Sequence, residues 1–137
     1  MLKKSTGRDT DMSRLFVYYN ARARANPEEP VEDGGCAITD AIDGFQEFGT
    51  CLETVWPYEP QHVNARPSEE AYEQGKEHRV IDPIRVEINM DDMKSCLAQG
   101  FPIAFGLELF ASFNEAEEAG IVPMPGSNEN VRQTHGK

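Results

Sequence analysis

The stretch that decides the fold runs from residue 13 to residue 49. It opens with SRLFVYYNARAR at residues 13–24 and closes with DGGCAITDAIDGFQEFG at residues 33–49. Around the first segment, apolar residues recur at helical spacing, namely at Met12, Leu15, Phe16, Tyr19 and Ala23. We therefore expect an amphipathic helix that ends before Asn26-Pro27, with N-cap oxygens offered by Asp9, Thr10 and Asp11.

The second segment predicts another helix. An acidic, proline-containing surface loop at residues 27–33 precedes it, and the pair Gly34-Gly35 then gives the backbone freedom to turn. Apolar residues of the segment share one helical face, namely Ile38, Ala41, Ile42, Phe45 and Phe48. Gly49 follows them and is expected to end the helix.

The residues after this pair of helices predict a connector and a short helix. Prolines in WPYEP at residues 56–60 disfavour helix in the residues before them, so we expect an ordered connector from Thr50 to Pro67. Ser68 can cap a short helix that contains Ala71 and Tyr72.

Strands are expected in the second half of the chain. RVIDPIRVEI at residues 79–88 predicts a strand with an edge or bulge proline, and FPIAFGLELF at residues 101–110 predicts a buried strand. Between them, Asn89 is expected to cap a helix that ends before Gly100. A Gly- and Pro-rich loop follows, up to His135. Helices followed by strands indicate an α+β protein.

Length and composition limit the class of protein. The chain has 137 residues, of which 39% are hydrophobic, enough for one core and too much for a disordered chain. The net charge of -11 would repel a phosphate backbone, so nucleic acid is not an expected partner. No apolar run has the length of a membrane-spanning helix, and the N-terminal residues lack the pattern of a signal peptide. We expect no membrane partner.

The cysteines and histidines do not indicate a metal site or a cofactor. Cys36, Cys51 and Cys96 are odd in number and lack CxxC spacing, so neither a disulfide framework nor a zinc site is expected. His62 and His78 have no ligand spacing with the cysteines. We expect no metal and no cofactor, and a reducing, cytoplasmic location.

The order of these pieces resembles one family. SRLFVYYNAR, then Asp33-Gly34-Gly35 before the second helix, then Trp56-Pro57-Tyr58, and later FPIAFGLEL and GIVPMP at residues 120–125 ahead of His135, together resemble the papain-like family of cysteine peptidases, particularly its bacterial-type members. The resemblance spans nearly residues 12 to 135. It implies an α+β papain-like cysteine proteinase fold that is incomplete, with a helical lobe and connector at residues 1–78 and part of the β lobe at residues 79–137.

The resemblance also implies roles for individual residues. His135 would be the general base and acid of peptide-bond hydrolysis. Gly34 and Gly35 would form the edge that holds the main chain of a peptide or protein substrate. Other small residues would line the substrate's second side-chain pocket or its wall, namely Ala37, Gly106 and Gly136.

Two catalytic parts of the family are missing from the printed sequence. The nucleophile motif Cys-Gly-x-Cys-Trp and the Asn-Ser-Trp motif do not occur in it. We therefore expect this portion to be inactive alone. Cys36 at the start of the second helix could have a thiol acidified by the helix dipole, or it could be a buried structural thiol.

A function of another class fits the same residues. The edge at Gly34-Gly35 could bind an extended peptide by strand addition without any chemistry, as in a pseudo-peptidase or binding module. In either case we expect exposed apolar faces or strand edges, which favour a homodimer.

Overall fold

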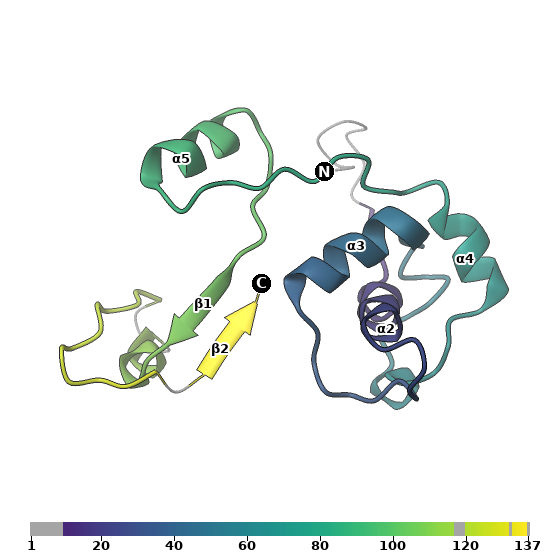
Figure 1. Cartoon of the computed structure of the whole chain (residues 1–137), viewed down its shortest axis with the longest axis horizontal. Helices are drawn as coiled ribbons and strands as arrows, with labels where there is room; N and C mark the ends of the chain where they lie inside the picture. The colour runs from purple at the N-terminus through teal and green to yellow at the C-terminus, as the bar shows by residue number, and fades with distance from the viewer. Residues whose placement is uncertain (1–9, 117–119, 132, 137) are drawn as a thin grey trace. The chain divides into compact units, whose positions relative to one another are not determined.

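The computed structural model describes residues 10–116, 120–131 and 133–136, the last four through their backbone alone. The chain divides between Ile103 and Ala104 into two compact units. In chain order the elements are α2 (Arg14–Ala25), α3 (Ile38–Phe48), η1 (Pro60–His62), α4 (Glu69–Gly75), α5 (Met90–Ala98), β1 (Gly106–Leu109), η2 (Ala111–Glu115) and β2 (Gln133–Gly136) (Figure 1). The predicted boundary between residues 78 and 79 concerns the lobes of the family fold and stays a prediction.

Helix α2 forms where the apolar spacing predicts it, but its cap differs from the predicted one. Ser13 is the N-cap, and its hydroxyl accepts a hydrogen bond from the Phe16 N–H at 3.1 Å. The residues before it are extended and pair with residues 51–53, so that the Asp11 carbonyl accepts from the Glu53 N–H at 2.9 Å. The predicted caps Thr10 and Asp11 are therefore wrong, because this pairing delays the helix until residue 14. Asp9 lies outside the described residues.

The core of the first unit is built on one face of α2. Phe16 is fully buried and contacts Cys51 and Ala71, with Phe48 and Tyr72 packed around them. The Phe16 and Tyr72 rings meet edge to face, with their centroids 5.1 Å apart. Figure 1 shows α2 nearly end-on, with α3 and α4 beside it. The connector supplies Cys51 and the short helix supplies Ala71, so both predicted elements are confirmed.

Helix α3 begins and ends as the sequence predicts. Gly49 follows it with a φ of 72°, a left-handed value that favours glycine. A Cβ built on Gly49 would lie 1.9 Å from the carbonyl oxygen of Gly75 at the end of α4. The glycine therefore lets the end of α3 approach the end of α4. Ser68 caps α4 as predicted, accepting from the Ala71 N–H at 3.2 Å.

Residues 79–103 contain the predicted helix but not the predicted strand. Asn89 caps α5 by accepting from the Asp92 N–H at 2.9 Å, as expected. Residues 79–88 form no strand, and Ile81 and Ile88 are 89% and 93% exposed. The strand prediction is wrong because the segment has no ladder partner among the described residues and Pro83 has no N–H to donate.

The second unit contains a two-stranded antiparallel sheet. Strand β1 pairs with β2 in the register Gly106 to Gly136 and Leu107 to His135. Only residues 106–109 of the predicted strand at residues 101–110 are in this ladder, and most are exposed, so the expectation of a buried strand is wrong. His135 lies in a strand, where the sequence predicted a loop.

A carboxylate organises the turn in the second unit. Glu129 accepts hydrogen bonds from the Gly126 N–H at 2.9 Å and the Ser112 N–H at 3.0 Å. These backbone donors, first Gly126 and then Ser112, hold the pKa of Glu129 below its ordinary value. The turn after residue 120 is thereby tied to η2.

Candidate functional site

The glycine pair predicted to hold a substrate lies in an exposed loop between α2 and α3. Gly34 donates its N–H to the Glu32 carbonyl at 2.9 Å, and Gly35 has a φ of 83°. A Cβ built on either glycine would have no atom within 4 Å. The space around the pair is therefore open, as a peptide-binding edge requires. Ala37, predicted to line the same site, is the N-cap residue of α3.

Tyr18 of α2 connects the two sides of this loop. Its hydroxyl donates to the Asp33 carboxylate at 2.7 Å and accepts from the Gly35 N–H at 2.9 Å. Partial burial, followed by the hydrogen bond to Asp33, raises the pKa of Tyr18 above its ordinary value. The hydroxyl therefore stays protonated at neutral pH and remains a donor to Asp33.

Arg22 fixes the start of the loop from one turn further along α2. Its side chain is 6% exposed and donates to the Glu32 carbonyl at 2.6 Å and to the Asn64 side-chain oxygen at 2.8 Å. It also donates to the Val63 carbonyl, and its guanidinium lies 3.9 Å from the centre of the Tyr18 ring. Arg22 thus ties the loop to the connector and holds the Tyr18 ring in place.

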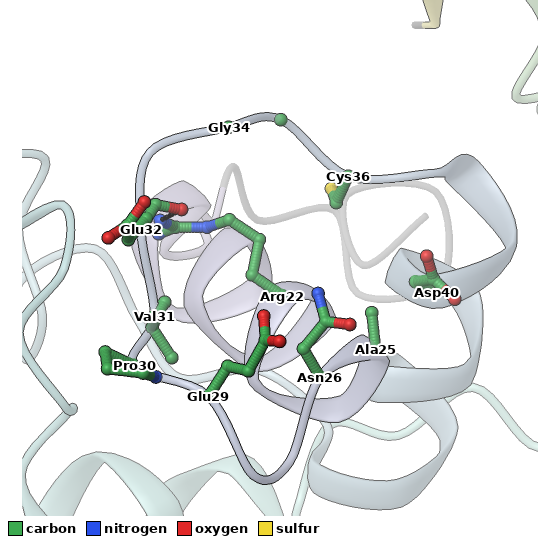
Figure 2. A pocket seen from close by; sticks show the side chains of 11 residues that line it. Arg22, Ala25, Asn26, Glu29, Pro30, Val31, Glu32, Gly34, Cys36 and Asp40 are labelled. Atoms are coloured by element: carbon green, nitrogen blue, oxygen red, sulfur yellow. Dashed lines mark hydrogen bonds between the residues drawn. The ribbon is translucent and has the colours of Figure 1, made fainter.

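A hollow of about 460 Å³ opens between the end of α2 and this loop. Figure 2 shows Arg22 extending along it toward Glu32, with Gly34 and Cys36 on its upper border. Its lining includes the carboxylates of Glu29, Glu32 and Asp40. Apart from Arg22, the charged residues of this lining are therefore acidic, and Ala25, Pro30 and Val31 add apolar surface.

Neither interpretation of Cys36 agrees with the structure. Cys36 is exposed, so it is not a buried structural thiol. Its pKa is raised above the ordinary cysteine value, chiefly because protein atoms displace water around the sulfur, with Arg22 opposing and Asp40 adding to the effect. The direction of this shift is opposite to the predicted acidification, because desolvation outweighs the effect of Arg22.

The other two cysteines are less exposed than Cys36. Cys51 is fully buried in the core, where burial is the main cause that raises its pKa. Cys96 is half-buried, and its thiol lies 3.8 Å from the Phe101 carbonyl oxygen. All three cysteines are free.

The remaining predicted site residues belong to the second unit. Gly106 and Gly136 are paired across the sheet, and His135 lies opposite Leu107. The ladder therefore places His135 next to Gly136, the predicted wall residue, and one position from the pair that includes Gly106, the predicted pocket residue. The described atoms of His135 are those of its backbone, so its role as general base stays a prediction.

Sequence reasoning did not assign roles to Tyr18 or Arg22. Both contact residues that are ten or more positions away, and helical periodicity predicts which residues share a face but not such tertiary partners. The available signal was the spacing of Tyr18 and Arg22, which are four residues apart on one helical face, together with Asp33 next to the glycine pair.

Among residues 10–116, 120–131 and 133–136, no group of three or more histidine, cysteine, aspartate or glutamate side chains is arranged to hold a metal ion. Within the same described part of the chain, no helix has the length and apolar character needed to cross a membrane.

Comparison with known proteins assigns the chain to a family. It is 36% identical, over an alignment of 137 positions, to an uncharacterized peptidase C1-like protein of Acanthamoeba polyphaga mimivirus, with 92% of this chain aligned. Its structure superimposes with a TM-score of 0.80 on xylellain, a cysteine protease from Xylella fastidiosa, covering 98% of this chain at 25% sequence identity. The chain belongs to the papain-like cysteine peptidase family. No family model matches it.

Membership in the papain-like family confirms the predicted fold, a helical part followed by part of the β region. The chain spans 43% of the length of the mimivirus relative and 55% of the xylellain chain. The matched regions therefore represent about half of such a protein.

Proposed function

We propose that this chain contributes the peptide-binding edge and the general base of a papain-like cysteine peptidase. Gly34 and Gly35 hold the main chain of an extended peptide, and Ala37, Gly106 and Gly136 line the space for its side chains. His135 transfers the proton. The observation that carries the proposal is the open, exposed glycine loop in a chain whose fold matches a cysteine protease.

The chemistry requires a thiolate that attacks the carbonyl carbon of the scissile peptide bond. The protonated imidazole of His135 donates its proton to the departing amine, which leaves a thioester. Neutral His135 then takes a proton from a water molecule, which attacks the thioester and releases the acid and the thiolate. Protons balance over the cycle, and His135 is needed in both halves.

The three cysteines of the printed sequence are poor candidates for this thiolate. Cys51 is buried in the core, and Cys36 has a raised pKa, so little of either exists as thiolate at neutral pH. Cys96 is half-buried on α5. We infer that the 137-residue polypeptide does not hydrolyse peptides by itself.

Thiol alkylation combined with a peptidase assay tests this inference. Purified polypeptide is incubated with fluorescein-labelled casein, and Cys36 alkylation by iodoacetamide is followed by mass spectrometry from about pH 6 to about pH 10. Because the Cys36 pKa is raised, alkylation should accelerate only above the ordinary cysteine pKa of about 8.5, and casein should stay intact.

The matched variants are Cys36→Ser and His135→Ala. Alkylation at position 36 should disappear in the first and keep its pH profile in the second. If Cys36 instead reacted rapidly near pH 6 and slowed about tenfold or more in His135→Ala, the two side chains would form a working pair, and the inference of inactivity would be wrong.

The alternative is a non-catalytic peptide-binding module. The exposed Gly34-Gly35 loop favours it, because strand addition needs a backbone edge and no nucleophile. Binding of blocked peptides to the 137-residue polypeptide would support both proposals. Peptide binding that His135→Ala leaves unchanged, with no effect of this substitution on Cys36 alkylation, would favour the module.

We also propose a homodimer in a reducing, cytoplasmic compartment. Large apolar side chains at Ile81, Ile84 and Ile88 are exposed, and all three cysteines are free thiols. Sedimentation over about a hundredfold range of protein concentration tests the dimer. A constant monomer mass at about 100 μM would contradict it.

A further inference from the structure

The Gly35 N–H already has a hydrogen-bond acceptor within the protein. Its N–H donates to the Tyr18 hydroxyl at 2.9 Å, and this hydroxyl donates in turn to the Asp33 carboxylate at 2.7 Å. A hydroxyl that donates to a carboxylate becomes a better acceptor, because the two hydrogen bonds polarise each other. The Gly35 N–H therefore has a strong intramolecular partner, although the residue itself is exposed.

The backbone of Gly35 also has the wrong shape for strand addition. An added peptide strand needs a free N–H and C=O on an extended residue, with φ near -120° to -140°. Gly35 has a φ of 83°. Both its dihedral angle and its hydrogen bond thus disfavour pairing with a peptide in this conformation. Strand addition requires that the bond to Tyr18 break and that the residue become extended.

We propose that Tyr18 is a positioning residue that competes with peptide for the Gly35 amide and thereby sets the affinity of the Gly34-Gly35 edge. The proposal rests on the proposed peptide-binding function. The Tyr18 hydroxyl occupies the Gly35 N–H as its acceptor, and a peptide carbonyl replaces this hydroxyl when an extended chain binds. Gly34 and Gly35 permit the change, because no atom lies within 4 Å of the position of their missing side chains.

The hydroxyl and the ring of Tyr18 have different contacts. The Tyr18 ring is held by the Arg22 guanidinium at 3.9 Å, and Arg22 is itself fixed by the Glu32 and Val63 carbonyls. Removing the hydroxyl therefore frees Gly35 and Asp33 but leaves the ring and the start of the loop in place. This makes Tyr18→Phe an informative variant.

The test uses the 137-residue polypeptide and a matched control. Tyr19 is the next residue of α2 and lines a different hollow, so Tyr19→Phe removes the same atom outside the Gly35 network. Hydrogen exchange of the Gly35 amide is followed by NMR in the wild type, Tyr18→Phe and Tyr19→Phe. Exchange at Gly35 should accelerate about threefold to tenfold in Tyr18→Phe, the range expected for one lost hydrogen bond, and should not change in Tyr19→Phe.

Peptide affinity is then measured with a defined probe. A pool of acetylated and amidated hexapeptides is screened by its effect on the Gly34 and Gly35 amide signals, and the peptide with the largest effect is titrated into each variant. Tyr18→Phe should bind it about threefold to tenfold more tightly than the wild type and Tyr19→Phe. A merely structural role of Tyr18 would weaken binding or leave it unchanged, so a gain in affinity is specific to competition.

A second variant keeps the proposal testable if Tyr18→Phe folds poorly. Asp33→Ala removes the acceptor of the Tyr18 O–H but keeps the hydroxyl, so the gain in affinity should have the same sign and be smaller. Equal affinity in the wild type and both variants would overturn the competition while leaving peptide binding intact. Failure of every variant to bind any hexapeptide would overturn the proposed peptide-binding function itself.

Discussion

Residues 11–78 and residues 79–103 contain similar local sequence signals, but their apolar side chains are buried to different extents. The first stretch buries Phe16, Cys51 and Ala71 completely. The second leaves Ile81 and Ile88 89% and 93% exposed. In the first stretch, apolar side chains from α2, the connector and α4 meet one another. In the second stretch, no layer of apolar side chains from the described residues covers Ile81 and Ile88. An apolar side chain is buried only where another element packs against it.

Side-chain helix caps occur in both stretches, although α3 has none. Ser13, Ser68 and Asn89 each accept a hydrogen bond from a backbone N–H in the first turn of their helices. Local hydrogen bonding therefore does not explain the difference. The two stretches differ in tertiary contact, and substitutions in each stretch can test this difference.

The largest effect is expected for Gly49→Ala. The new Cβ would lie 1.9 Å from the Gly75 carbonyl oxygen and 2.9 Å from the His78 carbonyl oxygen, on a residue with a left-handed φ. Strain and two backbone clashes add up to a loss of about 5 kcal/mol or more in the free energy of unfolding. Urea denaturation followed by circular dichroism should show the helices of the first unit unfolding at much lower urea concentration.

Gly34→Ala is the matched control for this change. Its Cβ would have no atom within 4 Å, and its φ is not left-handed, so the free energy of unfolding should change by less than about 1 kcal/mol. Equal stability of the Gly49 and Gly34 variants would show that the close approach of α3 and α4 does not hold the core together.

The next largest effect is expected for Phe16→Ala. This ring is fully buried and contacts Cys51, Ala71 and the Tyr72 ring, so its removal leaves a cavity in the core of the first unit. We expect a loss of about 4 kcal/mol in the free energy of unfolding. Urea denaturation measures it, and a loss below about 1 kcal/mol would contradict the packing described for α2.

A smaller effect is expected for Ser13→Ala. The hydroxyl accepts from the Phe16 N–H at 3.1 Å and donates to the Trp56 carbonyl at 2.6 Å in a buried position. Losing the cap and the second hydrogen bond should lower the free energy of unfolding by about 2 kcal/mol.

Asn89→Ala removes the same kind of cap from exposed α5 and is the comparison for Ser13→Ala. It should reduce protection of the α5 amides from hydrogen exchange without moving the main urea transition, because a helix with no buried residues is expected to unfold locally. Equal shifts of that transition in both variants would mean that α5 belongs to the same cooperative unit as α2.

The sequence predicted helices well and strands poorly, for a physical reason. A helix satisfies its hydrogen bonds within one segment, so the apolar spacing of residues 14–25 and 38–48 and the caps at Ser68 and Asn89 were sufficient. A strand needs a partner, which local sequence does not contain. The strand predicted at residues 79–88 has none among the described residues, and β1 is limited to the four residues that β2 pairs with.

The candidate site could be predicted only in part. The backbone freedom expected at the glycine pair is present, since Gly35 adopts a left-handed φ, but its role in holding a substrate stays a prediction. The Tyr18 network was missed because it joins residues 15 and 17 positions apart. The state of Cys36 was misjudged because its pKa depends on the protein atoms around the sulfur, which the helix position alone does not reveal.

The smallest effect is expected for Ile88→Ala, which tests the second side of the comparison. This side chain is 93% exposed, so shortening it removes almost no buried apolar surface. The free energy of unfolding at low protein concentration should change by less than about 0.5 kcal/mol. If a homodimer covers this segment, the same variant should weaken dimer formation at high concentration, because the apolar area lost from the interface scales with binding free energy. A loss of about 1 kcal/mol or more that does not depend on concentration would instead mean that residues 79–88 pack within one chain, and the contrast with residues 11–78 would no longer hold.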